Sequence, residues 1–268
     1  MSSPDRIVSL CAGNSELLFA LGISSKVVGV DSSTDWPGEY ANVQKVGSEL
    51  EIDIDRVTAL KPDLVLASLS IPGMEKNIRG LQQAGLPYIV IDPHGFDDIW
   101  DNIRVIGRAT GAADRAETLI ADLQSRITAV RRRVPAGALP PKLFWEWWPN
   151  PLISPGGRNW ITNITEMAGC RHMTAEIDAD SAKPSKDEVV AYDPDYILLI
   201  WPGVPKERIK TSIATGRAGW EGMKAVRDGR VFAMEPEIFC RPSQRIVDGL
   251  ESLANLVWGG ATPPGEQL

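Results

Sequence analysis

Histidine and cysteine are scarce in this chain. Its 268 residues include 2 histidines, His94 and His172, and 3 cysteines, Cys11, Cys170 and Cys240. An odd number of cysteines without motif spacing forms neither a disulfide framework nor a zinc site, so each is expected to be a small buried hydrophobic residue. With two histidines, a Ser-His-Asp or Cys-His catalytic device has few options.

The motifs of several enzyme classes are also missing. The chain contains no GxSxG nucleophile elbow, no GxxxxGKS/T phosphate loop and no GxGxxG dinucleotide fingerprint. The acidic pairs Asp53 with Asp55 and Asp97 with Asp98 stand where helices are expected to begin. The helix dipole favours carboxylates there, which accounts for them without acid–base chemistry. We therefore predict a protein that is not an enzyme and has neither a cofactor nor a metal of its own.

Neither a surplus of basic residues nor a long hydrophobic run is present. The net charge is −7, and no nucleic-acid partner is expected because phosphate binding needs a basic face. The basic run at 131–133 is expected to end a helix, where cations complement the dipole. No stretch reaches the ~20 apolar residues of a membrane span. The first residues, MSSPDRIV, lack a basic and apolar leader, and a chain whose leader had been removed would begin in the same way.

What the chain does contain is an internal repeat. Residues 57–69 read VTALKPDLVLASL, and residues 189–201, which lie 132 positions later, read VVAYDPDYILLIW. Both are a helical apolar pattern, a Pro-Asp turn and then a continuous aliphatic run, which is typical of a buried strand. The repeat predicts two similar α/β lobes with a cleft between them, and clefts of this kind are where ligands bind.

Strand and helix patterns alternate along nearly the whole chain, which is typical of parallel sheets covered by helices. Strands are predicted at 6–10, 27–31, 64–68, 88–92, 142–147, 196–200 and 230–234, and helices near 14–21, 53–60, 74–84, 159–168, 185–192, 220–226 and 242–257. The predicted fold class is therefore α/β, with two Rossmann-like lobes whose sheets are mostly parallel.

A longer helix is predicted between the two halves. From Asp114 to Val134 the apolar residues recur in steps of three and four, which places them on one face of a helix. Asp114 and Glu117 have the spacing of a capping box. Such a helix, about 32 Å long, is either a rigid strut between the lobes or a long surface helix. The predicted division is 1–110 for the first lobe, 111–135 for the connecting helix and 136–268 for the second lobe.

Tryptophan is concentrated in the loops that follow the predicted strands. Trp36, Trp147, Trp148 and Trp201 all fall there, and ligands of parallel sheets collect at the carboxyl ends of strands. Tryptophan offers a large flat apolar surface with one hydrogen-bond donor, which suits a bulky ring-bearing ligand; the alternative is that these rings cap the lobe cores. His94 also stands at a strand end, where it either contacts the ligand or has no special role.

These segments resemble a known family. The stretches RIVSLCAGNSELLFALG, VVGVDSSTDWP and VTALKPDLVLAS resemble the substrate-binding proteins of bacterial ABC importers for cobalamin, ferric siderophores and haem, whose two lobes are joined by one long helix. The resemblance extends from Arg6 to about Trp258. FWEWWPNPLISPGGRNWITNITEMAGC and EIFCRPSQRIVDGLESLA look most like the cobalamin-binding branch.

The resemblance implies a set of ligand-binding residues, and it implies them loop by loop. The cobalamin branch commonly has aromatic residues at two positions that are Ser68 and Ile238 here. The implied contacts are Ala12, Gly13 and Asn14 after the first strand, Ser33 and Trp36 in the next loop, Ser68 after the Pro-Asp strand, Trp147 and Trp148 in the fourth loop, and Glu237, Phe239 and Arg241 in the last; Trp201 and His94 join them by their place at strand ends.

The resemblance also implies docking on the transporter through one acidic residue in each lobe. By motif the first is Glu75, and the second lies in SKDEVV at 185–190. Ser185 and Glu188 have capping-box spacing, which would occupy Glu188 locally and leave Asp187 as the docking carboxylate, with Glu188 in reserve. The alternative is that all three are first-turn acids favoured by the dipole. The two docking residues are expected in corresponding helices.

The sequence thus predicts a solute-binding component of an ABC importer that captures cobalamin or another corrinoid and delivers it to the membrane subunits. A ferric siderophore is the alternative, since Arg158, Arg241 and Arg245 could meet an anionic chelate. Haem is weaker because its iron takes a Tyr or His ligand, and the tyrosines of the chain stand mostly on predicted helices or strands: Tyr40, Tyr88, Tyr192 and Tyr196. An alternative of another class is a cofactor-processing enzyme on a similar scaffold. The protein is expected to be a periplasmic or extracytoplasmic monomer, either free or tethered by a lipid.

Overall fold

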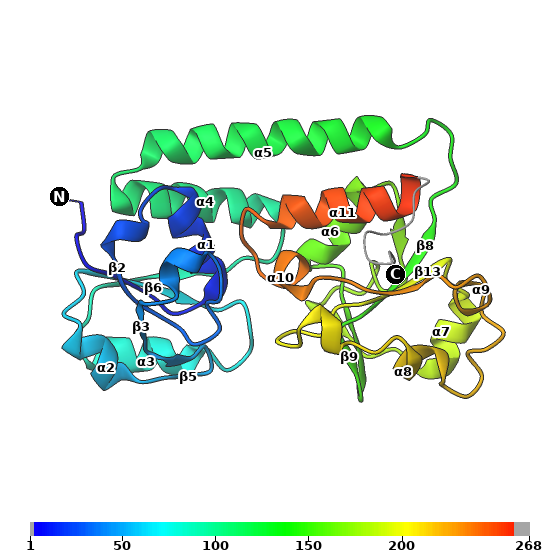
Figure 1. Ribbon diagram of the computed structural model, residues 1–268, viewed down its shortest axis with the longest axis horizontal. Helices are drawn as coiled ribbons and strands as arrows, with labels where there is room; N and C mark the ends of the chain where they lie inside the picture. Colours follow the sequence, from blue (N-terminus) through cyan, green and yellow to red (C-terminus); the bar gives the residue numbers. More distant parts are fainter. Residues whose placement is uncertain (1–2, 260–268) are drawn as a thin grey trace. The chain divides into compact units, whose positions relative to one another are not determined.

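The computed structural model describes residues 3–259, and its contacts divide the chain into two compact units. The first unit ends at Leu123 and regains Pro242–Gln244; the second comprises Gln124–Arg241 and resumes at Arg245. Each unit contains a parallel sheet with helices packed on it (Figure 1). Within the described residues, no helix combines the length and the apolar character that crossing a membrane requires. The predicted α/β class is confirmed.

The first unit is built on a five-stranded sheet. Its elements are β1 (Ile7–Ser9), α1 (Ala12–Ala20), β2 (Val27–Val30), β3 (Gln44–Lys45), β4 (Gly47–Ser48), β5 (Glu51–Ile52), α2 (Ile54–Ala59), β6 (Leu64–Ser68), α3 (Glu75–Gln83), β7 (Tyr88–Ile91) and α4 (Phe96–Thr110). The strand order is β3-β2-β1-β6-β7, and every pairing in it is parallel. Helices α1 and α4 cover one face and α2 and α3 the other (Figure 1). All five residues of β6 are buried, as expected for an aliphatic strand in a parallel sheet.

The second unit is built on a four-stranded parallel sheet in the order β11-β8-β13-β14. Its elements are β8 (Lys142–Glu146), β9 (Trp148–Pro149), β10 (Leu152–Pro155), α6 (Trp160–Met167), β11 (Arg171–His172), β12 (Ser181–Ala182), α7 (Lys186–Tyr192), β13 (Tyr196–Leu199), α8 (Ser212–Thr215), α9 (Lys224–Arg227), β14 (Val231–Ala233), α10 (Pro236–Phe239) and α11 (Ile246–Trp258). Strands β9, β10 and β12 form a small antiparallel sheet that the sequence pattern did not predict, because its strands are two to four residues long.

The repeated Pro-Asp segments have matching backbones. Lys61 and Asp193 directly precede the two prolines, with φ of 48° and 46°. They are the only residues other than glycine with positive φ in the described part of the chain. A side chain in this left-handed region costs free energy, so the turn must be held by its surroundings. The internal repeat is therefore a repeat in conformation as well as in sequence.

The aspartates of the two segments perform the same task. Asp63 accepts hydrogen bonds from the backbone N–H groups of Asp5 and Arg6, at 2.8 and 2.9 Å, where β1 begins. Asp195 accepts one from the backbone N–H of Lys142, at 2.8 Å, where β8 begins. In each unit the carboxylate thus satisfies a strand-end amide and fixes the start of the neighbouring strand.

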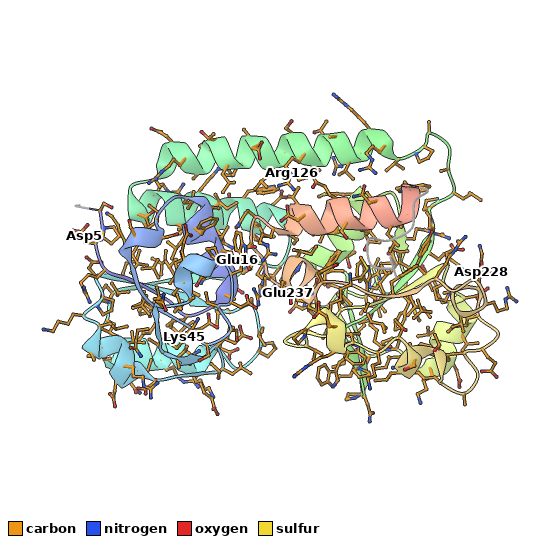
Figure 2. The ribbon with its side chains drawn as sticks, viewed as in Figure 1. Asp5, Glu16, Lys45, Arg126, Asp228 and Glu237 are labelled. Carbon is orange, nitrogen blue, oxygen red and sulfur yellow. The ribbon has the colours of Figure 1, made fainter. Side chains whose placement is uncertain are left out.

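The long helix α5 (Ala113–Arg133) matches the predicted helix, and its last turn carries the three arginines. The boundary between the units falls inside it, between Leu123 and Gln124. Within the second unit, Arg126 of α5 pairs with Asp248 and Glu251 of α11 at 2.6 and 2.8 Å (Figure 2). The capping box predicted for its start is wrong.

The structure shows why that capping box does not form. The helix starts at Ala113, so Asp114 lies inside the first turn, and the Glu117 carboxylate instead accepts a hydrogen bond from Arg104 of α4 at 3.0 Å. Gly111 ends α4 in the left-handed conformation, which leaves little chain between the two helices for a separate cap residue.

Several helix predictions also need correction. Helix α4 was predicted only as a start near Asp97 and Asp98, although its apolar residues have helical spacing over all of Phe96–Thr110. The predicted helix at 220–226 is reduced to the four residues of α9, and α8 and α10 were not predicted. The last helix begins at Ile246 instead of 242.

The late start of α11 has a tertiary cause. Pro242–Gln244 belong to the first unit, where Ser243 Oγ donates a hydrogen bond of 2.5 Å to the carboxylate of Glu16 in α1. Both Ser243 and Glu16 are fully buried. A segment held by this contact cannot also form the first turn of a helix in the second unit.

Candidate functional site

The predicted residues of the first unit follow strands β1, β2, β6 and β7, which are parallel, so they lie along one edge of the sheet. Ala12, Gly13 and Asn14 form the first turn of α1 and are all buried. Asn14 Nδ2 donates to the carbonyl of Ala67 at 3.2 Å, which ties α1 to the end of β6. Because their side chains are buried, these three residues have little surface with which to contact a ligand.

The loop after β2 combines an aromatic ring with a buried polar network. Trp36 is half-buried and packs edge-on against Phe19, with 4.9 Å between ring centroids. Ser33 is exposed, and its backbone N–H donates to the Asp31 carboxylate at 2.8 Å. Asp31 is fully buried and also accepts a hydrogen bond from the Thr34 hydroxyl at 2.5 Å. Burial raises the pKa of Asp31, although these hydrogen bonds act in the opposite direction.

Hydroxyl groups extend the hydrogen-bond network of Asp31 towards β1. Ser15 Oγ lies 3.1 Å from Thr34 Oγ1 and donates to Ser9 Oγ at 2.9 Å. Lys45 Nζ donates to the Thr34 carbonyl at 2.5 Å (Figure 2). The first unit thus builds its carboxyl edge from small polar side chains that satisfy one another.

Ser68 and His94 complete the first set. Ser68 is buried at the end of β6, and its hydroxyl donates to Ser70 Oγ at 2.9 Å. The His94 side chain is 51% exposed, with Nε2 at 3.6 Å from the Asp92 carboxylate. Its backbone N–H donates to the Asp98 carboxylate, which also caps α4 at Gly95 as the dipole argument for Asp98 predicted. Of the two, only His94 offers a chemically reactive side chain at the surface.

In the second unit, tryptophans gather at the carboxyl end of β8. Trp147 is half-buried, and its Nε1 donates to Cys240 Sγ at 3.3 Å. Trp148 is 40% exposed, whereas Trp201 is 6% exposed. The Trp148 and Trp201 rings pack against each other with centroids 6.4 Å apart and planes at 59°. Trp201 therefore supports the exposed ring and has almost no surface left for a ligand.

The predicted ligand-binding residues of the last loop also include both partly exposed and fully buried side chains. Glu237 lies on α10 (Figure 2) and is half-buried, as is Arg241. Phe239 is fully buried against Trp145, with centroids 5.1 Å apart, and its carbonyl accepts a hydrogen bond from Trp160 Nε1 at 2.7 Å. In this structure Phe239 is a core residue, while Glu237 and Arg241 keep exposed surface.

A buried ion pair that the sequence pattern did not predict lies beside Trp201. Glu146 ends β8 and is fully buried, and Arg217, from the segment between α8 and α9, pairs with it through both guanidinium Nη atoms. The signal was present, because Glu146 is a charge inside the aromatic run FWEWW. A carboxylate in a buried strand requires a partner, although the sequence does not reveal which residue supplies it.

The predicted docking acids lie at helix starts. Glu75 begins α3 and accepts a hydrogen bond from the Gly73 N–H at 2.8 Å. The capping box on α7 is confirmed: Glu188 accepts from the Ser185 N–H at 2.7 Å, and this bond lowers the pKa of Glu188. Asp187 is exposed, and no hydrogen bond of its carboxylate is found in the described chain.

The helices that carry these acids do not correspond. Helix α7 precedes the Pro-Asp turn of the second unit, whereas α3 follows the strand after that turn in the first. The counterpart of α7 by the repeat is α2.

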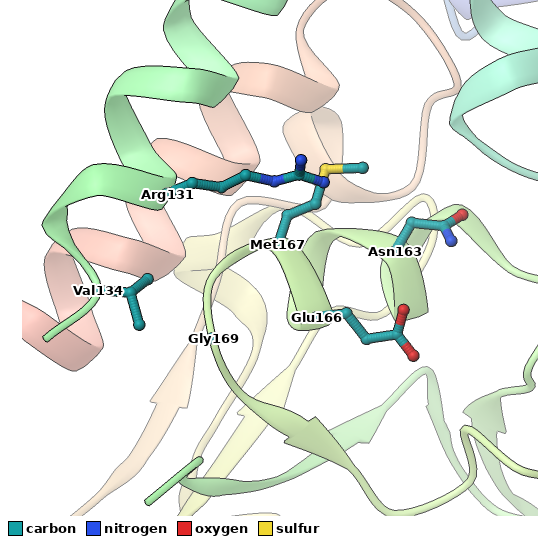
Figure 3. A pocket seen from close by; sticks show the side chains of 6 residues that line it. All are labelled: Arg131, Val134, Asn163, Glu166, Met167 and Gly169. Carbon is teal, nitrogen blue, oxygen red and sulfur yellow. The ribbon is translucent and has the colours of Figure 1, made fainter. Parts of the chain in front are cut away.

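A pocket in the second unit lies apart from all predicted residues. It has a volume of about 510 Å³ and is lined by residues from the end of α5 and from α6 with the turn after it: Arg131, Val134, Asn163, Glu166, Met167 and Gly169 (Figure 3). This turn precedes β11, so the pocket is at the amino side of the sheet, opposite the tryptophans.

The three cysteines have buried or half-buried side chains and bear on whether a metal could be held. Cys11 and Cys170 are buried and Cys240 is half-buried, and burial raises the pKa of each thiol to about 12. In residues 3–259, no three His, Cys, Asp or Glu side chains are grouped as a metal site would require. Taken separately, the carboxyl edge of the first sheet carries a polar network beside Trp36, and that of the second carries two tryptophans with exposed surface.

Comparison with known proteins identifies the family. The family model described as periplasmic binding protein matches residues 7–238. The uncharacterized ABC transporter substrate-binding lipoprotein YvrC of Bacillus subtilis (strain 168) is 31% identical over 261 residues, which are 95% of this chain and 80% of that protein. A vitamin B12-binding protein of Vibrio parahaemolyticus is 23% identical over 247 residues, covering 92% and 86%.

A solved structure agrees at the level of the fold. The periplasmic haem-binding protein RhuT from Roseiflexus sp. RS-1 superposes with a TM-score of 0.83 at 24% identity, covering 97% of this chain and all of that one. Because the family model matches most of the chain, this protein belongs to the periplasmic binding protein family.

Proposed function

We propose that this chain is the substrate-binding component of an ABC importer and that it captures a bulky ring-bearing metal chelate, first of all cobalamin or another corrinoid. The observation that carries this proposal is the aromatic edge of the second sheet, where Trp148 keeps 40% of its surface exposed beside the half-buried Trp147. Flat indole surfaces with a single donor suit a large planar ligand. The relatives are named as substrate-binding and vitamin-binding proteins, which supports a carrier and not an enzyme.

Two other chelates have a specific observation in their favour. Haem is favoured by His94, whose imidazole is 51% exposed at the carboxyl edge of the first sheet and is of the type that ligates haem iron. A ferric siderophore is favoured by Arg241, which keeps exposed surface in the last loop and could meet an anionic chelate. Both remain within the same class of solute.

Calorimetric titration with cyanocobalamin, hemin and a ferric siderophore tests the proposal. One of the three should bind one-to-one, and Trp147→Ala and Trp148→Ala should each weaken that binding by about tenfold or more. The matched control is Trp258→Ala, because Trp258 is half-buried in the same unit but bonds to the Ala168 carbonyl, before β11 and away from the carboxyl edge. Absence of binding by all three ligands would overturn the proposed solute class.

If hemin binds, a second measurement separates it from the corrinoid. The Soret absorption of the bound hemin should shift when His94→Ala removes a ligand of the iron. An unchanged spectrum would remove His94 from the site.

We propose that the protein acts outside the cytoplasm as a monomer, either free in the periplasm or tethered by a lipid. The family description and the lipoprotein name of the Bacillus relative support this location. Equilibrium sedimentation of the purified protein tests the monomer, and a dimer at micromolar concentration would contradict it.

Glu75 and Asp187 are proposed to dock on the transporter. Both are exposed, and the capping box on α7 occupies Glu188 and so leaves Asp187 as the available carboxylate of that turn. The double variant Glu75→Ala with Asp187→Ala should bind ligand like the original protein and fail to stimulate the transporter ATPase. Asp97→Ala, which removes another exposed acid from a first helical turn, is the control. Normal stimulation by the double variant would refute these two residues, and Glu188 would then be tested.

A further inference from the structure

A buried ion pair of the second unit adjoins Trp201, the ring that packs against the exposed Trp148. The Glu146 side chain is 0% exposed and that of Arg217 is 8% exposed. Arg217 Nη2 donates to Glu146 Oε1 at 3.0 Å, and Nη1 donates to Oε2. Transferring two charges out of water costs free energy that a pair recovers only when its geometry is very good. The pair is therefore weak evidence for a role in stability and calls for another explanation.

The same carboxylate fixes a tryptophan. Glu146 Oε1 also accepts a hydrogen bond from Trp201 Nε1 at 3.2 Å. The indole N–H is the only donor of that side chain, so this bond selects one orientation of the ring. Trp201 is 6% exposed, so its ring has almost no surface for direct contact with a ligand. It can affect ligand binding only through the side chain that packs on it.

That supported side chain is Trp148. The centroids of the two rings lie 6.4 Å apart, with the planes at 59°, and Trp148 is 40% exposed. The exposed ring thus packs against a buried ring whose indole N–H is bonded to Glu146.

Arg217 is held from its other side as well. Its guanidinium carbon lies 4.5 Å from the centroid of the Trp220 ring, which is within cation–π distance. Trp220 packs edge-on against Phe144, with 6.1 Å between centroids, and Phe144 precedes Glu146 by two residues on β8. The guanidinium is therefore clamped between a carboxylate and a ring that both depend on the same strand.

We infer that Glu146 and Arg217 are positioning residues that hold Trp201 in place and thereby set the tilt of Trp148, the ring surface that the second unit offers to a flat chelate. A ring fixed before binding loses less conformational freedom when the ligand arrives, which favours affinity. The role for the ligand rests on the proposed function, whereas the geometry of the two rings exists without it.

The double variant Glu146→Leu with Arg217→Met tests this inference, because replacing both charges by apolar groups can leave the fold intact. Two neighbouring indoles couple in circular dichroism, and the contribution of the pair is identified as the signal that Trp148→Phe removes. In the ligand-free double variant that signal should be lost. The melting temperature should stay within about 5 °C, and the dissociation constant for cyanocobalamin or hemin, whichever binds, should rise about tenfold.

The control is Lys224→Met, which breaks the 2.6 Å pair between Lys224 and Asp195 at the opposite edge of the same sheet. It should leave both the dichroic signal and the affinity unchanged. If the double variant does not fold, Arg217→Lys replaces it. That change keeps the charge and loses the double hydrogen bond, so the signal should shrink.

Two results would overturn the inference. One is a folded double variant, or Arg217→Lys, that keeps both the signal and the affinity; the other is loss of the signal in Lys224→Met as well. If the original protein binds none of the tested chelates, the proposed function fails, while the dichroic comparison still decides whether the ion pair positions the rings.

Discussion

The two units of this protein are alike at the amino edges of their sheets and unlike at the carboxyl edges. At the amino edges, Asp63 and Asp195 each follow a proline; Asp63 accepts hydrogen bonds from amides directly before β1, and Asp195 accepts one from the first amide of β8. At the carboxyl edge, the first unit has a network of small hydroxyl side chains around Asp31, whereas the second has Trp147, Trp148 and an ion pair.

The difference separates what the fold needs from what a ligand needs. The amides at the start of a strand need hydrogen-bond acceptors, and the Pro-Asp turn supplies one in each unit. The carboxyl edges of parallel sheets carry the ligand contacts, so they are the positions at which two similar units can diverge without losing their fold.

The largest effect is expected at the buried charges of the two carboxyl edges. Glu146→Ala leaves the Arg217 guanidinium buried without a carboxylate and should lower the free energy of unfolding by about 3–5 kcal/mol. Asp31→Asn keeps only one of the two oxygens that accept hydrogen bonds from the Thr34 hydroxyl and the Ser33 amide, so one of these bonds is lost and the change should cost about 1–2 kcal/mol. Urea unfolding measures both, and equal losses would contradict the distinction between an ion-paired and a hydroxyl-bonded charge.

Acid should weaken the second unit through His172. Burial lowers the pKa of His172 to about 4, although its hydrogen bond to the Pro155 carbonyl acts in the opposite direction. The unfolded chain takes up this proton near pH 6.5 and the folded chain does not, so stability is lost as the pH falls from about 6.5 towards 4, by up to about 3 kcal/mol.

Urea midpoints measured across this pH range, in the original protein and in His172→Asn, test that expectation. The variant should lose most of the slope. Burial raises the pKa of Asp31 in the first unit, which gives a slope of the opposite sign, because protonation in acid relieves the buried charge. An acid loss that is unchanged in His172→Asn would assign it to another group.

A moderate effect is expected at the shared Pro-Asp turns. Asp195→Ala should cost about 1–2 kcal/mol, because this carboxylate accepts hydrogen bonds from both the Lys142 amide and Lys224 Nζ. Burial alone would raise the pKa of Asp195, but those bonds lower it overall. Asp63→Ala removes a more exposed carboxylate and should cost less. Thermal melts rank the two, and a larger loss for Asp63 would reverse the order.

The smallest effect is expected at the left-handed residues of the Pro-Asp turns. Lys61→Gly relieves the strain of positive φ and should stabilise the protein by about 0.5–1 kcal/mol. Asp193→Gly gives the same relief but loses the hydrogen bond of 2.8 Å that the Asp193 carboxylate accepts from the Lys224 amide, so its net effect should be near zero. Equal stabilisation by both changes would show that this bond contributes nothing.

The sequence predicted much of the fold because its signals are local. The aliphatic runs of β6 and β13, the stripe along α5 and the capping box at Ser185 depend on residues within a few positions of one another. The predictions failed where distant contacts decide. Glu117 pairs with Arg104 instead of capping α5, and Ser243 bonds to Glu16, 227 residues away, instead of starting α11.

For the candidate site, too, the local features could be predicted and the features that depend on distant contacts could not. The positions of Trp148 and Trp201 after parallel strands followed from the pattern, since carboxyl ends of such strands share an edge. Which ring is exposed and which is buried did not follow, because the buried Trp201 bonds to Glu146, whose partner Arg217 stands 71 positions further along the chain.

By itself, the sequence determined the order of the central strands and of most longer helices, the two Pro-Asp turns and the placement of aromatic residues at strand ends. Each of these follows from backbone preferences and the spacing of apolar residues along the chain. Only the tertiary structure decided that Phe239 and Trp201 are buried, that Trp148 is exposed and that a buried ion pair stands behind it. Burial and ion pairing depend on residues brought together from distant parts of the sequence, and no local pattern records which ones will meet.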